Sequence, residues 1–336
     1  MSTALSGRHL LTILLSVFFL AAASPAFAVV ICVWDPLGSQ GEGFSTMKDY
    51  ALTARSWGAD VQLRAYADER VATEDFKAGQ CDAALISGLR ARGFISFTGS
   101  IDSVGSIPSY THMRKVIELL ANPKLTPKMI SGPYEFAGAV PLGAAYSFVN
   151  DRKINSMAKA AGKKVAVLDW DKSQSEVARM VGAVPVQSDI TNFAGKFNNG
   201  QVDIIFCPIV GYKALELYKG IGTKGGIARY PIVQVTAQLI IRRDKFPPDF
   251  GLKSRILIAD QVPRFFGIIR NVEREVDPAH WMTVPLSDRD GYEKVMRELR
   301  IHLTKAGYYD PAMMTLLKRV RCKMEPDNAE CSQSEE

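Results

Sequence analysis

A short sequence pattern occurs twice in the chain, and it constrains the possible folds more than any other feature. The pattern is F-x-x-G-Q-x-D, found at residues 76–82 and again at residues 197–203. Each copy follows a Gly-Ala pair at a similar distance, and each leads into an apolar run. A glycine followed by a short apolar run is typical of the end of a helix and the start of a buried strand. We therefore predict two similar α/β lobes.

The segments around the two copies favour parallel-rich sheets covered by helices. In both halves of the chain, apolar runs and helical stretches alternate in the order β-α-β-α-β. This order is typical of a parallel sheet with crossover helices. Two longer extended runs, residues 136–149 and 231–242, are interpreted as hinge strands that cross between the lobes in opposite directions.

Two crossings divide the chain discontinuously. Lobe 1 is predicted to comprise residues 29–145 plus about 236–262, and lobe 2 residues 146–235. Residues 263–336 are predicted to strap both lobes with helices and to end in a polar tail. Helical periodicity is found there at residues 263–273, 288–305 and 311–321.

Residues 1–28 have the organisation of a secretory signal peptide. An apolar run over residues 10–23 is followed by the small-x-small ending Ala26-Phe27-Ala28. The run is shorter than the ~20 residues that cross a bilayer. We expect cleavage after Ala28 and export to the periplasm. The alternative is an uncleaved N-terminal anchor.

The chain contains five cysteines, and export would allow them to oxidise. Cys322 and Cys331 enclose a polar stretch with proline and asparagine that can turn, so we predict a disulfide between them. Cys32 with Cys81 is a second, less supported pairing, and an odd count leaves at least one cysteine unpaired. The four histidines are scattered and no C-x-x-C motif occurs, so we expect no metal site.

Charge and motifs argue against two functional classes. The 336 residues carry a formal net charge of +6, and no stretch has five or more consecutive Lys or Arg residues, so nucleic acid is not an expected partner. The sequence has neither G-x-S-x-G nor H-E-x-x-H. A G-x-G-x-x-G match at residues 220–225 follows a predicted helix and precedes a strand, the reverse of the dinucleotide-binding context. We expect no enzyme and no cofactor.

The order of the elements predicts where a ligand would bind. In parallel α/β sheets, ligands bind outside the carboxyl ends of the strands, so two such lobes would share an interlobe cleft. From lobe 1 we expect Trp34 and Asp35, at the start of a glycine-bearing loop, and Ser87, Arg90 and Arg92 after a later strand. Only one of the two arginines is expected to enter the cleft, because residues two apart need not face the same way in a loop.

The second lobe is expected to complete this site. The predicted residues follow its strands or lie near the crossing segment: Tyr146, Arg152, Asp169, Trp170, Cys207 and Tyr212.

Several segments carry a family resemblance that covers most of the mature chain. Those at residues 162–167, 182–186 and 200–203 resemble the second lobe of the periplasmic solute-binding proteins of TRAP transporters, the C4-dicarboxylate (DctP-like) receptors. Other segments resemble the AdeT-like solute-binding proteins, a group associated with RND-type drug efflux; these are residues 49–52, 68–72, 86–92, 148–152 and 216–220. The resemblance implies a two-lobe, type II periplasmic-binding-protein-like fold.

The resemblance also implies a function, which two departures qualify. It implies a monomeric receptor that captures a small polar or anionic solute for an inner-membrane, TRAP-like transporter. TRAP receptors use an arginine on a second-lobe strand to clamp the ligand carboxylate, and an asparagine before a proline. Ala166 and Cys207 occupy these positions here. The alternative is an envelope adaptor or accessory protein of an efflux system that has lost ligand capture.

Overall fold

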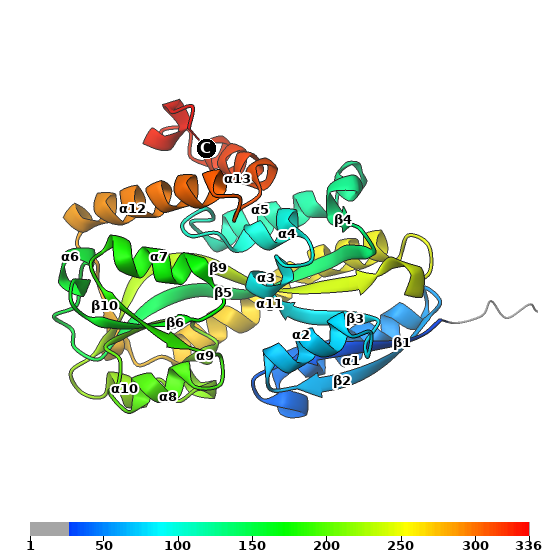
Figure 1. The fold of residues 1–336 in the computed structure, drawn as a ribbon, viewed down its shortest axis with the longest axis horizontal. Helices are drawn as coiled ribbons and strands as arrows, with labels where there is room; N and C mark the ends of the chain where they lie inside the picture. The colour runs from blue at the N-terminus through cyan, green and yellow to red at the C-terminus, as the bar shows by residue number, and fades with distance from the viewer. Residues whose placement is uncertain (1–26, 336) are drawn as a thin grey trace, which may run out of the picture.

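The structure is a computed structural model that describes residues 27–335. The predicted signal peptide and its alternative, an N-terminal anchor, lie outside these residues except for Phe27 and Ala28. Ten strands form one mixed sheet whose main path runs β2-β1-β3-β9-β5-β8-β6-β7 (Figure 1). We call the half with β2, β1 and β3 lobe 1, and the half with β8, β6 and β7 lobe 2.

Two long antiparallel strands at the centre of the sheet join the lobes. They are β5 (Tyr134–Val149) and β9 (Gly226–Arg242). These strands confirm the predicted crossing segments and their opposite directions, although they join the lobes into one sheet. The register between them shifts beside Gly143, whose φ of +93° is accessible to glycine at little cost.

Lobe 1 combines three parallel strands with helices on both sides of the sheet. The strand β1 is a continuous apolar run because it is paired on both edges and buried. The elements are β1 (Phe27–Trp34), α1 (Glu42–Arg55), β2 (Ala59–Tyr66), α2 (Glu69–Lys77), β3 (Ala83–Ser87), α3 (Gly88–Ala91), α4 (Ser96–Gly99), α5 (Tyr110–Leu120) and β4 (Ile130–Ser131).

Lobe 2 repeats this arrangement with shorter elements. Strand β6 lies between β8 and β7 and is parallel to both. The elements are α6 (Met157–Ala160), β6 (Lys164–Leu168), α7 (Lys172–Met180), β7 (Val184–Ser188), α8 (Phe193–Asn198), β8 (Ile204–Pro208), α9 (Gly211–Ala214) and α10 (Tyr218–Ile221).

The repeated sequence pattern has the same structural role in both lobes. Its phenylalanine is fully buried in each copy, and its glycine has a positive φ after the helix. Its aspartate then binds the lobe's first strand: Asp82 accepts a hydrogen bond from Val30 N in β1, and Asp203 accepts one from Lys164 N in β6, each at 2.8 Å. The pattern thus attaches the helix–strand unit to the neighbouring strand.

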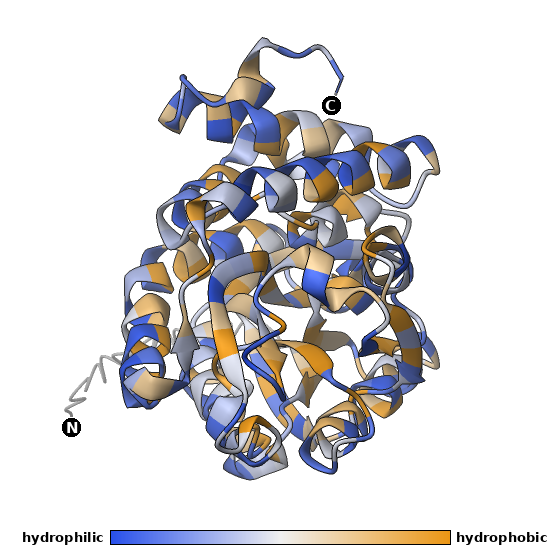
Figure 2. Ribbon diagram, turned by 90° about the vertical axis from the view of Figure 1, so that its left-hand side faces the viewer, coloured by the Kyte–Doolittle hydropathy of each residue, from blue (hydrophilic) through white to orange (hydrophobic). Residues whose placement is uncertain are grey.

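Three helices that come after β9 connect the lobes. Helix α11 (Phe250–Glu275) packs on β5 and α5, α12 (Leu286–Lys305) packs on α7 and α6, and α13 (Pro311–Met324) packs on α5 and α4. The helices α12 and α13 lie along one side of both lobes (Figure 1). Surface helices carry hydrophilic and hydrophobic residues along their length, as expected for elements with one buried face (Figure 2).

The start of α11 corrects a predicted boundary. The sequence indicated a helix from Pro263, where the helical periodicity was recognised. The helix instead begins at Phe250 and continues through Pro263, because Phe250 and Ile258 are buried upstream of it. Short elements complete the fold: η1 (Gly38–Gln40), η2 (Ser100–Asp102), η3 (Pro123–Met129), η4 (Arg243–Lys245), η5 (Pro278–His280), β10 (Trp281–Met282) and η6 (Ala329–Ser332).

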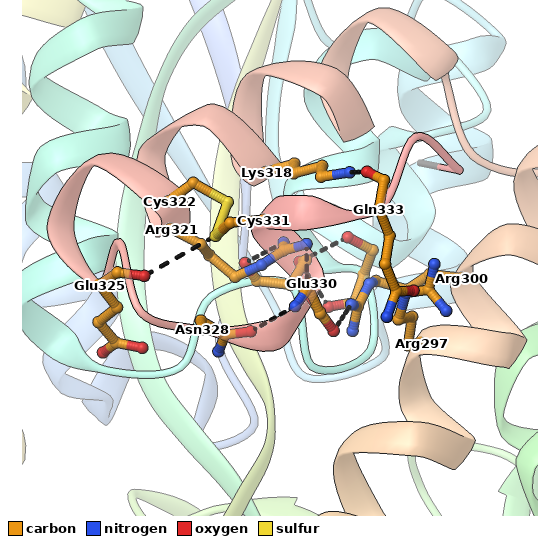
Figure 3. Close-up of polar contacts among 12 residues, drawn as sticks. Arg297, Arg300, Lys318, Arg321, Cys322, Glu325, Asn328, Glu330, Cys331 and Gln333 are labelled. Atoms are coloured by element: carbon orange, nitrogen blue, oxygen red, sulfur yellow. Dashed lines mark hydrogen bonds and ion pairs between the residues drawn. A yellow bond between two sulfur atoms is a disulfide. The ribbon is translucent and has the colours of Figure 1, made fainter.

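Both predicted disulfides are present. Cys32 is bonded to Cys81 and Cys322 to Cys331, and Cys207 is a buried free thiol. The second disulfide attaches η6 to α13 (Figure 3).

The attached tail provides a carboxylate to two buried arginines. Glu330 accepts from Arg300 Nη2 at 2.7 Å and from Arg321 Nη2 at 2.9 Å (Figure 3). The same arginines donate to the carbonyl oxygens of Val104 and Ser106. The tail therefore helps to position the loop that contains Val104.

Candidate ligand-binding cavity

A cavity of about 110 Å³ lies between the two lobes. The last residue of four strands, which are parallel within each lobe and run in opposite directions in the two lobes, lines it: Trp34 of β1, Ser87 of β3, Leu168 of β6 and Pro208 of β8. Two of these strands belong to each lobe. The carboxyl ends of both half-sheets therefore meet at one cavity, as predicted for the ligand site.

Most of the cavity wall is apolar. The two hinge strands contribute Leu142 and Ala145 from β5 and Ile232 from β9. Lobe 2 adds Phe193 and Phe206. A wall of this kind favours a solute with an apolar body and stabilises it by removing that surface from water.

The charged groups in the wall are carboxylates. Glu69, Asp102 and Asp171 line the cavity, and its lining residues, all of which the structure describes, include no Arg, Lys or His. Ala166 also lines it, at the position where the family resemblance implied an arginine. This cavity therefore lacks the guanidinium that would clamp a ligand carboxylate.

Asp102 is a buried cavity carboxylate whose hydrogen-bond donors both belong to one residue of β9. Its oxygens accept hydrogen bonds from Thr236 N at 2.9 Å and Thr236 Oγ1 at 2.7 Å. Burial raises the pKa of Asp102 to about 7, and the hydrogen bonds from Thr236 oppose this shift only in part. Near neutral pH this carboxyl group can therefore accept or donate a hydrogen bond.

Glu69 and Asp171 are fixed by neighbouring donors. Glu69 accepts from Ser87 N at 2.6 Å and from Arg90 Nε at 3.2 Å, while burial raises its pKa. Asp171 caps helix α7 through Ser173 N and also accepts from Tyr308 Oη at 2.7 Å. The bond from Tyr308 connects the α12–α13 loop to lobe 2.

Arg90 and Trp170 form a contact between the lobes. The guanidinium carbon of Arg90, in lobe 1, lies 4.2 Å from the ring centroid of Trp170, in lobe 2. A cation–π contact of this kind stabilises a closed arrangement by about 0.5–2 kcal/mol. Neither residue lines the cavity itself.

Arg92 lies behind the cavity wall. Its guanidinium stacks on Tyr308 at 4.4 Å and on Tyr309 at 5.0 Å, and its Nε donates to Gly99 O. The nitrogens Nη1 and Nη2 are buried and have no hydrogen-bond partner among the described residues. Arg92 therefore offsets nearby negative charge from Asp102 without reaching the cavity surface.

The structure places several predicted site residues in roles outside the cavity wall. Asp35 is buried and accepts from Leu37 N and Phe44 N, so it holds the glycine-bearing loop. Asp169 is exposed on the surface. Cys207 is buried between Phe206 and Pro208, which do line the cavity.

The remaining three predicted residues lie around η5 and β10. Tyr212 Oη is 2.9 Å from His280 Nδ1. Arg152 Nη1 donates to Ala279 O at 2.6 Å, and its Nη2 donates to Trp281 O. Tyr146 lines a second cleft, described below. Trp34 and Ser87 are thus the predicted residues that line the interlobe cavity, with Arg90 and Trp170 beside it.

Three cavity carboxylates were missed from the sequence. Asp171 could have been found, because it follows strand β6 by three residues and precedes a helix, where aspartate is a favoured cap. Asp102 had no local signal, since its position depends on a contact with Thr236, 134 residues away. Glu69 faces the cavity from the first turn of α2.

Asp102 is predicted to make the free energy of unfolding depend on pH. Its folded pKa of about 7 exceeds the ordinary value of 3.8, so the folded state binds the proton more tightly. This contribution is complete below about pH 4 and is lost as the pH rises through about 7. At about 1.4 kcal/mol per pKa unit, the loss is several kcal/mol.

Urea unfolding at a series of pH values would measure this effect in the native protein and in Asp102→Asn, which cannot titrate. The free energy of unfolding of the native protein minus that of the variant should decrease between about pH 4 and pH 8. A difference that does not change with pH would contradict the assignment.

Among residues 27–335, no three metal-ligating side chains come together in a group that could hold an ion. In the same part of the chain, no helix combines the length and the apolar character needed to span a bilayer.

Comparison with solved structures identifies the fold. A TRAP periplasmic solute-binding protein from Desulfovibrio salexigens with bound orotic acid has a TM-score of 0.72 and 13% sequence identity, covering 89% of this chain and 99% of the other. One from Haemophilus influenzae RdAW with bound L-gulonate also has a TM-score of 0.72, with 12% identity, covering 87% and 99%. The fold is that of the TRAP solute-binding proteins.

Sequence comparison then gives the family. The model of the family described as "Solute-binding protein AdeT 1/2" matches residues 51–336. The chain is 50% identical over 304 residues to "Probable solute-binding protein AdeT1" of Acinetobacter baumannii, covering 90% of this chain and all of the relative. It is 28% identical to "Probable solute-binding protein AdeT2" of the same organism, covering 70% and 99%. The protein belongs to the AdeT 1/2 family of solute-binding proteins.

Proposed function

We propose that this protein is a periplasmic receptor that captures one small polar solute in the interlobe cavity and presents it to an inner-membrane, TRAP-like transporter. The observation that carries the proposal is the cavity where four strand ends from two lobes meet. Export through a signal peptide cleaved after Ala28 would place the receptor in the periplasm. Closure would occur about β5 and β9, with lobes bounded as the sequence predicts.

The cavity wall favours a polar solute over an anionic one. Three lining carboxylates and no lining cation would repel a ligand carboxylate and leave it without a bidentate partner. The same carboxylates can accept hydrogen bonds from hydroxyl or ammonium groups. A compact solute with an apolar body and such a donor fits both the wall and its polar groups.

A thermal-shift panel tests this proposal. A ligand at a hundredfold excess over its Kd should stabilise the protein by roughly 2.7 kcal/mol. The panel should contain matched compounds that share a carbon skeleton and differ only in an amine, an alcohol or a carboxylate. We expect the amine or alcohol to stabilise the protein more than the carboxylate. No response from any member, together with an empty cavity by native mass spectrometry, would contradict ligand capture.

The contact between Arg90 and Trp170 gives a separate prediction. Trp170→Ala and Arg90→Ala should each weaken solute binding by about three- to thirtyfold, because the lost contact lowers the population of the closed form. Isothermal titration would measure the change, and circular dichroism would show that the fold is retained. Trp170→Ala is the cleaner variant, since Arg90 also pairs with Glu69. Unchanged affinity in both variants would refute this role.

The absence of a cation from the lining of the cavity also favours a second candidate function. An AdeT-family protein that had lost anion capture could act as an envelope adaptor for an efflux system. Affinity capture from envelope extracts distinguishes the two functions. An inner-membrane permease as partner supports the receptor, and efflux components support the adaptor.

A further inference from the structure

A second cleft lies at the end of α11 and shares no lining residue with the interlobe cavity. Its volume is about 660 Å³. It is lined by the C-terminal part of α11, by β5, β9 and β10, and by the connection between α11 and β10. We call it the basic cleft, because its lining includes Arg229, Arg270 and Arg274.

The three arginines have no carboxylate partner among the described residues. Arg229 is exposed and stacks on Trp281, with its guanidinium carbon 4.7 Å from the ring centroid. Arg270 and Arg274 are exposed one turn apart on α11, where like charges oppose each other. Arg274 Nη2 donates to Asn271 Oδ1, which is uncharged. The positive charge of the cleft is therefore not balanced by ion pairs.

The one carboxylate in the cleft is already occupied by phenol groups. Glu273 Oε1 accepts hydrogen bonds from Tyr110 Oη at 2.5 Å and from Tyr146 Oη at 3.2 Å. These bonds fix α11 to β5 and α5. With three guanidinium groups and one carboxylate, the lining has a net charge of +2.

The shape and chemistry of the cleft suit a small organic anion. Small-molecule sites commonly have volumes of about 300–1,000 Å³ and combine apolar faces with a few charged groups. Tyr146 and Trp281 supply aromatic faces, with ring centroids 5.2 Å apart. Planar guanidinium groups match phosphate and carboxylate oxygens in bidentate geometry.

We propose that the basic cleft binds a small, multiply charged anion that bears phosphate or carboxylate groups. This site is separate from solute capture and does not depend on it. The arginines that could bind an anion thus lie on β9 and at the end of α11, away from the position that Ala166 occupies in the interlobe cavity.

Titration with inorganic pyrophosphate and with citrate tests the proposal in the full mature chain. Isothermal titration at low salt would measure affinity, and tryptophan fluorescence would report occupancy through Trp281. We expect saturable binding of at least one of the two anions. Its affinity should fall steeply as salt is raised, because the arginines are exposed and screened.

Charge variants assign the binding to the cleft. Arg229→Gln should lower the affinity for the anion by about tenfold, since it removes charge-assisted hydrogen bonds. The double variant Arg270→Gln/Arg274→Gln should lower the affinity by more, for the same reason. Glu273→Gln should tighten binding by about threefold because it removes a repelling charge, an effect that damage to the fold would not produce. Arg319→Gln, the same change on an exposed part of α13, should leave the affinity unchanged.

Two outcomes would overturn the proposal. One is the absence of binding of either anion at low-millimolar concentration in low salt. The other is binding that persists unchanged in the arginine variants, which would place the anion elsewhere. Solute capture in the interlobe cavity would survive both outcomes, so the failure of one proposal is distinguishable from the failure of the other.

Discussion

Glu330→Gln is expected to lower the free energy of unfolding by about 3 kcal/mol or more. Glu330 binds two arginines whose side chains are only 1% and 4% exposed, and its own side chain is 15% exposed. Removing the carboxylate from buried positive charges costs far more than breaking a surface ion pair, because the charges stay desolvated. Urea unfolding at neutral pH would measure the loss.

Glu325→Gln is the matched control for this prediction. Glu325 lies on the same tail segment, but its side chain is 48% exposed and its partner is the imidazole of His112 at 3.6 Å, whose pKa is lowered by burial. The control should change the unfolding free energy by less than about 1 kcal/mol. Equal effects in the two variants would show that the Glu330 contacts do not hold the tail and the Val104 loop in place.

Ala166→Arg is expected to abolish solute capture, with a loss in affinity of about a hundredfold or more. Ala166 is 4% exposed and its side chain faces a cavity of about 110 Å³, which a long side chain would fill. The new guanidinium would face Glu69, Asp102 and Asp171, so its charge would be compensated. The binding measurement is isothermal titration with whichever compound stabilises the native protein.

Two further substitutions keep this prediction testable if the arginine prevents folding. Ala166→Met fills the cavity with a flexible apolar chain and should also exclude the solute. Ala166→Ser adds a single oxygen atom and should keep most of the affinity. A solute that binds equally well to all three variants does not bind in the interlobe cavity.

The sequence was sufficient to predict the architecture because the repeat encodes local contacts. The aspartates of the two copies, Asp82 and Asp203, bind the first strand of their own lobe, so a short pattern specifies a helix, a strand and its neighbour. The long strands β5 and β9 were visible as extended runs. The start of α11 was not visible, because the helical pattern was recognised only from Pro263 onward, whereas the helix begins at the buried Phe250.

The candidate site was only partly predictable for a physical reason. Strand ends are fixed by sequence pattern, so Trp34 and Ser87 could be placed at the cavity. The direction of a loop side chain depends on distant partners: Arg152 binds the carbonyl oxygens of Ala279 and Trp281, and Arg92 stacks on Tyr308. Contacts of this kind leave no local pattern in the sequence.

Native mass spectrometry of protein freshly purified from the periplasm tests the central claim most directly. If the interlobe cavity captures a solute, the native chain should carry one small molecule of constant mass, and Ala166→Arg should carry none. A native chain without any bound molecule, or an adduct that persists unchanged in the variant, would contradict solute capture in this cavity.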